Sequence, residues 1–248
     1  MRNIAFLGCG KIGKELLRHV EKEQLANVVF IEDGRAELPG ETVISSADVI
    51  YYEKADLVIE CATADALKEH IAVILQHADL MLFSVTAFAD EAFQKQVEEL
   101  CETYHHKVYI PHGAILGIDG IFDGRNVWKR VTIETTKSPK SLGREDTERT
   151  VVYEGPTRAV CSQYPRNVNV HAAVALAGLG FDRTYSCIIS DPAVSTNAHK
   201  IRLEGDGIDI TLDISSYAAG AVTGAYTPHS ACGSLDRILK TEQKRIFV

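Results

Sequence analysis

The feature that most constrains the fold of this 248-residue chain is a cluster of three glycines near its start. Gly8, Gly10 and Gly13 have the spacing G-x-G-x-x-G, and the apolar run 3–7 comes directly before them. Apolar residues then recur at helical spacing, at Ile12, Leu16, Leu17 and Val20. The pattern predicts a buried strand, a tight turn and an amphipathic helix, in that order.

A strand, turn and helix with this glycine spacing are typical of a dinucleotide-binding segment. Gly8 permits the tight turn, Gly10 lets the backbone approach a pyrophosphate, and Gly13 lets the helix pack closely on the strand. The phosphates would accept hydrogen bonds from the N–H groups at the helix start, where the helix dipole favours negative charge. Lys11 and Ile12 lie in that first turn and complete this part of the predicted cofactor site.

An acidic residue in the right place strengthens this interpretation. Asp33 lies 20 residues beyond Gly13, after the apolar run 28–31, where an acid binds the ribose hydroxyls. Glu32 is the alternative if the strand end is displaced by one residue. An acid favours NAD over NADP, but Arg35 would tolerate a 2′-phosphate, so the predicted cofactor is NAD or NADP.

The three glycines have two other interpretations. Three glycines can simply form a turn, and a methyltransferase also has a glycine loop before a helix and an acid after the second strand. The spacing after the third glycine and the presence of a second domain argue against a methyltransferase.

The first 111 residues predict a Rossmann-type α/β domain. Short apolar runs alternate with amphipathic helices, as a parallel sheet covered on both faces requires. Further strands are predicted at 42–44, 57–59 and 80–85, and helices at 67–75 and from Asp90 onward. Small residues follow two of these strands, at the sheet edge where such proteins bind ligands. Cys61, Ala62, Thr63 and Ser84 are therefore predicted to contact the ribose and nicotinamide, although a crowded strand end also requires small residues.

The pattern changes after residue 111. Alternating strands are predicted at 131–135, 150–153 and 186–189, an alanine-rich helix at 169–177, and a hairpin around Gly205-Asp206-Gly207. The expected second domain, 112–228, is of the α+β class with a mixed or antiparallel sheet. A last helix, 230–246, is predicted to return to the first domain, which then comprises 1–111 and 229–248.

Charge and cysteine usage exclude several classes of partner. Twenty-six Lys and Arg against 34 Asp and Glu give a net charge of −8, which argues against nucleic acid or an anionic membrane and favours a small molecule. The six cysteines are scattered without a CxxC pair, and no signal peptide is evident, so a cytoplasmic location is expected. His105-His106 lacks suitable partners, and no metal site is predicted. The alternating strands of the second domain could present a flat sheet face to a twin, and suggest a homodimer.

Four segments resemble the L-aspartate dehydrogenase family. They are GAILGIDG at 113–120, TTKSPKSL at 135–142, PRNVNV at 165–170 and DPAVSTNAH at 191–199. The similarity runs from residue 2 to about residue 215. It implies a Rossmann domain, a mixed-sheet domain with the substrate residues, and a C-terminal helix that returns to the first domain.

The resemblance also implies an activity. Members of the family oxidise L-aspartate with NAD or NADP to iminoaspartate, which hydrolyses to oxaloacetate and ammonia or enters quinolinate and NAD synthesis. The family's catalytic histidine corresponds to His199, and its cofactor-contacting asparagine and alanine correspond to Asn169 and Ala114. The chain departs from the family at His112 and His171, where small residues are usual, and in a shortened loop at 226–231.

The chemistry of the residue types agrees with these roles. An imidazole such as His199 can take the proton that an ammonium must lose before hydride leaves the α-carbon. Without the resemblance, a lone histidine is more often a surface or core residue. A dicarboxylate substrate needs cations, and Lys137 and Arg166 are the candidates, with Asn197 beside them. For Lys140 a solvated surface charge is at least as good an interpretation, and Asn169 could be a plain helix cap.

Two classes of function stay open. The first is an NAD(P)-dependent dehydrogenase acting on L-aspartate, with homoserine or another small amino or hydroxy acid as the alternative substrate. The second is a non-catalytic NAD(P)-binding sensor that has kept the fold.

Overall fold

The computed structural model describes residues 1–34, 38, 40, 42–45, 48–217 and 224–240. The chain forms two compact units, Met1–Pro111 with Pro228–Val248, and His112–Thr227. Arg35 and the last residues of the predicted helix 230–246 lie outside the described residues.

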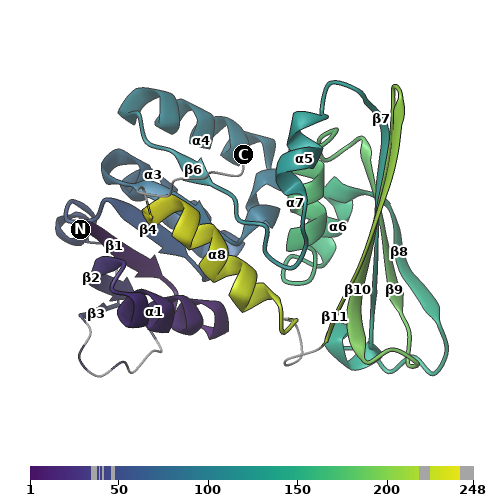
Figure 1. Ribbon diagram of the computed structural model, residues 1–248, viewed down its shortest axis with the longest axis horizontal. Coiled ribbons are helices and arrows are strands. Elements are labelled where there is room, and N and C mark those ends of the chain that lie inside the picture. Colours follow the sequence, from purple (N-terminus) through teal and green to yellow (C-terminus); the bar gives the residue numbers. More distant parts are fainter. Residues whose placement is uncertain (35–37, 39, 41, 46–47, 218–223, 241–248) are drawn as a thin grey trace. The chain divides into compact units, whose positions relative to one another are not determined.

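The first unit contains a six-stranded parallel sheet in the order β3-β2-β1-β4-β5-β6 (Figure 1). The direction in which the strand order grows reverses at β1, so the carboxyl ends of β1 and β4 form the edge where doubly wound proteins bind dinucleotides. The predicted α/β fold is confirmed. The strands are β1 (Arg2–Leu7), β2 (Ala26–Glu32), β3 (Val43–Ile44), β4 (Leu57–Glu60), β5 (Asp79–Leu82) and β6 (Val108–Tyr109).

Helices join these parallel strands, as a doubly wound sheet requires. They are α1 (Lys11–Glu23), α2 (Val49–Tyr52), α3 (Ala64–His77) and α4 (Glu91–Tyr104). A further helix of this unit, α8 (Thr227–Leu239), comes from the end of the chain and joins no strands. The strand predicted at 80–85 is too long, because β5 ends at Leu82. The next two backbone N–H groups, of Phe83 and Ser84, donate to the Glu60 carboxylate, and a short 3₁₀ segment, Val85–Ala89, follows.

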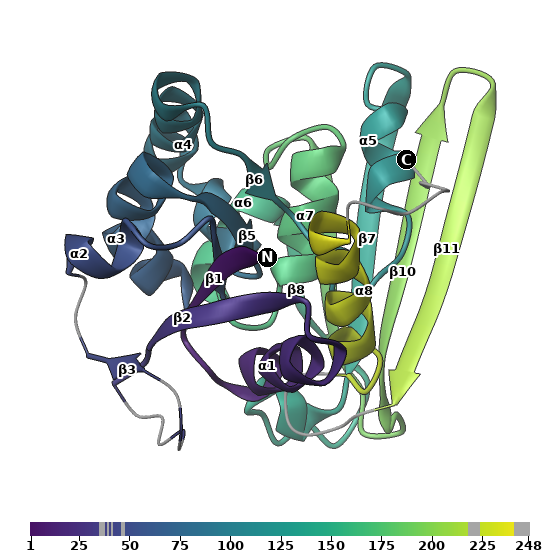
Figure 2. The ribbon, with the colours of Figure 1, turned by 60° about the vertical axis from the view of Figure 1, so that its left-hand side comes forward.

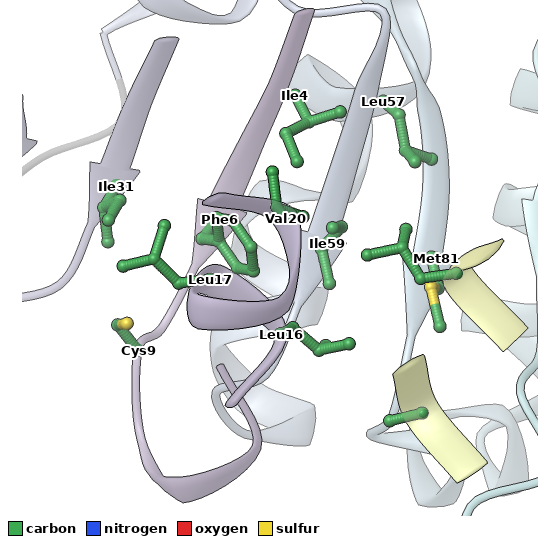
Figure 3. Close-up of a cluster of buried hydrophobic side chains, with 12 residues drawn as sticks. Ile4, Phe6, Cys9, Leu16, Leu17, Val20, Ile31, Leu57, Ile59 and Met81 are labelled. Atoms are coloured by element: carbon green, nitrogen blue, oxygen red, sulfur yellow. The ribbon is translucent and has the colours of Figure 1, made fainter. Parts of the chain in front are cut away.

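The core of the first unit explains why α8 belongs to it. Figure 3 shows Leu16, Leu17 and Val20 of α1 beside Phe6 and Ile59 of the sheet. Two residues of α8, Ala231 and Leu235, are completely buried in the same cluster. His19 of α1 and Asp236 of α8 also approach to 2.8 Å. The predicted return of the C-terminal helix is confirmed.

The second unit is a five-stranded sheet in the order β11-β10-β7-β9-β8. The β7–β9 pair is parallel and the others are antiparallel, so the sheet is mixed, as predicted. Its strands are β7 (Trp128–Lys137), β8 (Thr150–Pro156), β9 (Thr184–Ser190), β10 (Thr196–Gly205) and β11 (Ile208–Tyr217). The predicted hairpin joins β10 to β11, and Gly207 supplies the positive φ of +81° that its turn needs.

Helices lie on one face of this second sheet (Figures 1 and 2). They are α5 (Ile118–Asp123), α6 (Thr157–Gln163) and α7 (Asn169–Ala177), and a short 3₁₀ turn spans Pro139–Leu142. Because α7 packs on β7 and β9, alternate residues of those strands are buried beneath it. Across the described part of the chain, no helix has both the length and the apolar character that a bilayer crossing demands.

Candidate functional site

The glycine turn after β1 packs tightly against the end of β4. Gly8 has φ +82°, and a Cβ added there would lie 2.7 Å from Cβ of Ala62. A Cβ on Gly13 would lie 3.0 Å from the Gly8 carbonyl oxygen. These contacts bring the predicted cofactor residues of the first and fourth strands together at one edge of the sheet.

The start of α1 is open for an anion. Gly10 is the N-cap and makes no side-chain cap, and the first turn of the helix holds no acidic residue. A Cβ on Gly10 would meet nothing within 4 Å. Free space beside a helix N-terminus suits a pyrophosphate, because both the N–H groups and the helix dipole favour negative charge. Lys11 is exposed at this point and Ile12 is half-buried.

The two acidic residues after the second strand differ in their surroundings. Asp33 Oδ2 accepts a 2.7 Å hydrogen bond from the backbone N–H of Cys9, which ties this carboxylate to the glycine turn. Glu32 is buried, where Tyr52 Oη donates to it at 2.6 Å and His70 Nε2 lies 2.7 Å from it. Burial opposes the ionised form, but the contacts with His70 and Tyr52 hold the pKa of Glu32 below its usual value. Asp33 therefore lies at the turn, and Glu32 belongs to the interior.

Glu60 organises the edge of the sheet, a role that no motif or spacing in the sequence indicated. Its carboxylate is fully buried at the end of β4 and accepts hydrogen bonds from the backbone of Ala62, Phe83 and Ser84. The Ser84 hydroxyl donates to it as well, at 2.8 Å. Burial raises the pKa of Glu60 against the effect of these donors. The side chain of Ser84 is thus hydrogen-bonded to Glu60 within the protein.

The other small residues at this edge have structural partners too. The Thr63 hydroxyl caps α3 by accepting from the backbone N–H of Ala66 at 3.2 Å. Cys61 is half-buried, and burial raises the pKa of its thiol well above the usual value, so it is not a reactive thiolate. At this edge of the sheet, backbone N–H and C=O groups are therefore the groups that we expect to contact a ligand.

On the buried face of the second unit's sheet, polar side chains gather at one end of the neighbouring strands β7 and β10. His199 on β10 stands directly opposite Thr135 on β7, and Nδ1 of His199 lies 2.8 Å from Oγ1 of Thr135. Lys137 and Asn197 follow two residues further along the same face, and all four side chains are buried. The remaining buried positions of these two strands, Trp128, Val131, Ile133, Ile201 and Leu203, are apolar or aromatic.

Burial makes His199 a neutral imidazole. Its side chain is 3% exposed, and desolvation together with the charge of Lys137 lowers its pKa to about 3. Within the described residues, Nε2 of His199 has no hydrogen-bond partner. The contact that holds the ring is therefore made through Nδ1.

Lys137 is a buried cation without a carboxylate partner among the described residues. Nζ lies 3.4 Å from both the backbone oxygen and Oδ1 of Asn167. Burial lowers its pKa to about 8. Neutral oxygens at this distance compensate a buried ammonium poorly, so the position favours binding of an anion.

Two residues without an assigned role join this cluster. The Thr135 hydroxyl lies 2.6 Å from Nε2 of His171, which is completely buried on α7. Nδ1 of His171 in turn lies 2.9 Å from the hydroxyl of Ser186. The alternation along β7 places Thr135 on the face of Lys137, and this was the available sequence signal.

The remaining predicted residues lie at varied positions in the second unit. Arg166 is exposed, next in sequence to the Asn167 that contacts Lys137. Asn169 is the first residue of α7 and not its cap, which is Val168. Ala114 is half-buried in a turn before α5. The side chain of His112 lies 3.3 Å from Asp119. In the described segments, no group of His, Cys, Asp and Glu side chains is arranged to hold a metal ion.

Comparison with known proteins gives consistent matches for both units. Residues 8–111 match the family described as homoserine dehydrogenase, NAD binding domain, and residues 122–238 match aspartate dehydrogenase, C-terminal. L-Aspartate dehydrogenase of Methanosarcina barkeri is 34% identical over 83% of this chain and 84% of its own length. The enzyme of Thermotoga maritima is 32% identical over 81% of each chain.

Comparison with solved structures agrees with these sequence matches. The crystal structure of aspartate dehydrogenase from Thermotoga maritima has a TM-score of 0.82, with 30% identity over 100% of both chains. An engineered D-amino acid dehydrogenase bound to NADP⁺ has a TM-score of 0.53 at 14% identity over 96% of this chain and 87% of its own, a likeness of fold alone.

Proposed function

Since this chain belongs to the L-aspartate dehydrogenase family, we propose that it oxidises L-aspartate with NAD or NADP to iminoaspartate, which hydrolyses to oxaloacetate and ammonia, and that it catalyses the reverse amination. One observation carries the assignment of the site: a buried neutral imidazole, His199, shares a sheet face with a buried ammonium, Lys137. A base and a cation are the two groups that an amino dicarboxylate requires.

The glycine turn would hold the dinucleotide. Backbone N–H groups from Gly10 to Gly13 would bind the pyrophosphate, and Asp33 the ribose hydroxyls. The free space at Gly10 and the absence of an acidic residue from the first turn of α1 support this. Ala114 and Asn169 of the second unit would contact the nicotinamide portion, as would the backbone of Cys61, Ala62, Thr63 and Ser84. When bound, the nicotinamide supplies the acceptor for the hydride.

His199 would act as the general base. Its Nε2 takes a proton from the substrate ammonium, and the freed nitrogen lone pair can then develop into the C=N bond as hydride leaves the α-carbon. The same nitrogen later returns the proton, or activates the water that hydrolyses the imine. Lys137 would bind a substrate carboxylate, with Arg166 and Asn197 as the further candidates for substrate contacts.

The substrate itself improves the base. The charge of Lys137 contributes to the low pKa of His199 in the free protein. A carboxylate bound at Lys137 would offset that charge and so raise the pKa of His199, while burial, the larger cause of the low pKa, would remain. His199 is then a stronger base in the complex, where it must take the proton of the substrate ammonium.

Another substrate is the alternative. The match of residues 8–111 to the homoserine dehydrogenase NAD-binding family is compatible with a small amino or hydroxy acid. The match of residues 122–238 to the aspartate dehydrogenase C-terminal family favours aspartate, because that unit contains His199 and Lys137. A non-catalytic sensor would have no use for a buried base beside a buried cation.

The experiment is a direct assay. The purified protein is incubated with L-aspartate and NAD⁺ or NADP⁺, and reduced cofactor is followed by absorbance; oxaloacetate, ammonia and NADH test the reverse reaction. L-Homoserine, L-malate and L-alanine are run in parallel. Turnover with aspartate at the highest kcat/KM supports the proposal. A preference for homoserine or malate overturns the substrate, and tight NADH binding without turnover overturns the enzyme.

We also propose that the protein is a cytoplasmic homodimer acting on a small molecule, without nucleic acid or membrane partners. All six cysteines are free thiols, which suits a reducing compartment. Val151 and Tyr185, on neighbouring strands of the second sheet, are exposed large side chains available to a twin. Light scattering on the purified chain tests the dimer.

A further inference from the structure

A chain of buried hydrogen bonds begins at His199 and ends at a backbone carbonyl. Oγ1 of Thr135 lies between Nδ1 of His199 and Nε2 of His171, at 2.8 and 2.6 Å. Nδ1 of His171 lies 2.9 Å from Oγ of Ser186. That oxygen is 2.7 Å from Oγ1 of Thr157, which donates to the carbonyl of Thr184 at 3.0 Å. The members come from β10, β7, α7, β9 and α6, and each is no more than 3% exposed.

The carbonyl at the far end sets the direction of every bond. A carbonyl only accepts, so the Thr157 hydroxyl gives its proton to Thr184 and accepts from Ser186. The Ser186 hydroxyl is then an acceptor for Nδ1–H of His171. Neutral His171 therefore has a bare Nε2, which accepts from the Thr135 hydroxyl.

His171 is neutral under ordinary conditions. Burial, aided by the neighbouring charges, lowers its pKa well below the usual value. With its proton given to His171, the Thr135 hydroxyl can only accept from His199, and so Nδ1 of His199 is the protonated nitrogen.

We propose that His171 is a positioning residue which, through Thr135, fixes His199 in the Nδ1–H tautomer and leaves Nε2 as the basic atom. This rests on the proposed function, in which Nε2 takes the substrate proton. The reversed chain would leave the buried Thr184 carbonyl without the Thr157 donor, which disfavours the other tautomer.

The chain holds a tautomer and does not conduct protons. A proton leaving His199 along it would have to arrive at the Thr184 carbonyl, which cannot take it up. When Nε2 of His199 gains a proton, Nδ1–H continues to donate to Thr135, so the same arrangement serves both states of the base. Proton exchange is thereby confined to the Nε2 side of the ring.

The test compares His171→Leu with His171→Gln. Gln places an amide oxygen near the position of Nε2 and can still accept from Thr135, whereas Leu cannot. The tautomer of His199 is read from the ¹⁵N shifts of its ring nitrogens in labelled protein, assigned with His199→Asn. We expect Nδ1 protonated and Nε2 bare in the wild type and in H171Q, and a mixture of tautomers in H171L.

Turnover gives the second measurement. We expect H171L to lower kcat roughly 10- to 100-fold, as removal of groups that orient a functional histidine generally does, with KM little changed and H171Q within a few-fold of wild type. Thr135→Val, paired with Thr135→Ser, repeats the comparison if H171L fails to fold. A wild-type His199 protonated on Nε2, or the same tautomer and kcat in H171L as in wild type, overturns the proposal. Since the tautomer is measured without substrate, absence of aspartate turnover would count against the proposed function alone.

Discussion

Nζ of Lys137 lies 3.4 Å from Oδ1 of Asn167, a part-buried polar contact at the position where we propose that a substrate carboxylate binds. The ammonium is 3% exposed and faces neutral oxygens, so its charge is poorly compensated in the ligand-free protein. A substrate carboxylate would supply the missing partner.

The charge of Lys137 makes dicarboxylate binding dependent on pH. Lys137 is protonated below its pKa of about 8 and neutral above it. Succinate should therefore bind with nearly constant affinity around pH 7, where both of its carboxylates are ionised, and about tenfold more weakly for each further pH unit well above 8. Titration calorimetry measures this directly.

The matched control is Lys137→Arg, because a guanidinium stays charged throughout this range. Its succinate affinity should be flat to pH 10, while Lys137→Met should bind poorly at every pH. An equally steep pH profile in the Arg variant would show that another group controls binding.

The same residue should lower the stability of the free protein. The folded-state pKa of Lys137 is about 8 against 10.5 for the ordinary side chain, so between these values the unfolded chain binds the extra proton and stability rises with pH. Below pH 8 the full penalty is present. Lys137→Met should increase the free energy of unfolding by up to about 3 kcal/mol at pH 7, and the gain should shrink as pH rises from 8 towards 10.5. Urea unfolding at pH 7 and pH 10 measures both; a variant less stable than wild type at pH 7 would contradict the argument.

Loss of the base should abolish chemistry without affecting cofactor binding. His199→Ala removes the proton acceptor, and kcat should fall roughly 10²- to 10⁴-fold, the usual contribution of a general base. NADH binding, followed by its fluorescence, should persist, since the glycine turn belongs to the other unit. Wild-type turnover in this variant would exclude His199 as the base.

Two glycines of the turn should respond differently to alanine. Gly8→Ala places a Cβ 2.7 Å from that of Ala62 at a φ of +82°, and should destabilise the fold by about 2–5 kcal/mol through backbone strain and overpacking. Gly10→Ala meets nothing within 4 Å and should fold normally. It should nevertheless bind NADH more weakly, because the added methyl group occupies the space left for the pyrophosphate. Thermal melts and fluorescence titrations separate the two effects, and normal cofactor affinity in Gly10→Ala would place the phosphates elsewhere.

Much of the fold follows from local pattern. The glycine spacing, the apolar strands and the amphipathic helices predict the first unit, and the alternation around Gly205 and Gly207 predicts the hairpin of the second. The end of β5 was missed because it coincides with contacts to Glu60, whose carboxylate accepts hydrogen bonds from the backbone N–H groups of Phe83 and Ser84. A contact between residues more than 20 positions apart leaves no periodic signal.

The features of the candidate site also divide into those that the sequence indicated and those that only the tertiary structure revealed. The glycine spacing predicted the phosphate-binding turn and the need of a dicarboxylate for cations made Lys137 a candidate, whereas His199 was identified through the resemblance to the L-aspartate dehydrogenase family. The tertiary structure determined which polar side chains form hydrogen bonds within the protein and which are left to contact a ligand. It buried Glu32 against Tyr52 and His70, placed Asp33 at the turn, and joined His171 to His199 through Thr135. Burial and hydrogen-bond direction arise only when distant segments pack together, and these two quantities set the protonation states on which the chemistry depends.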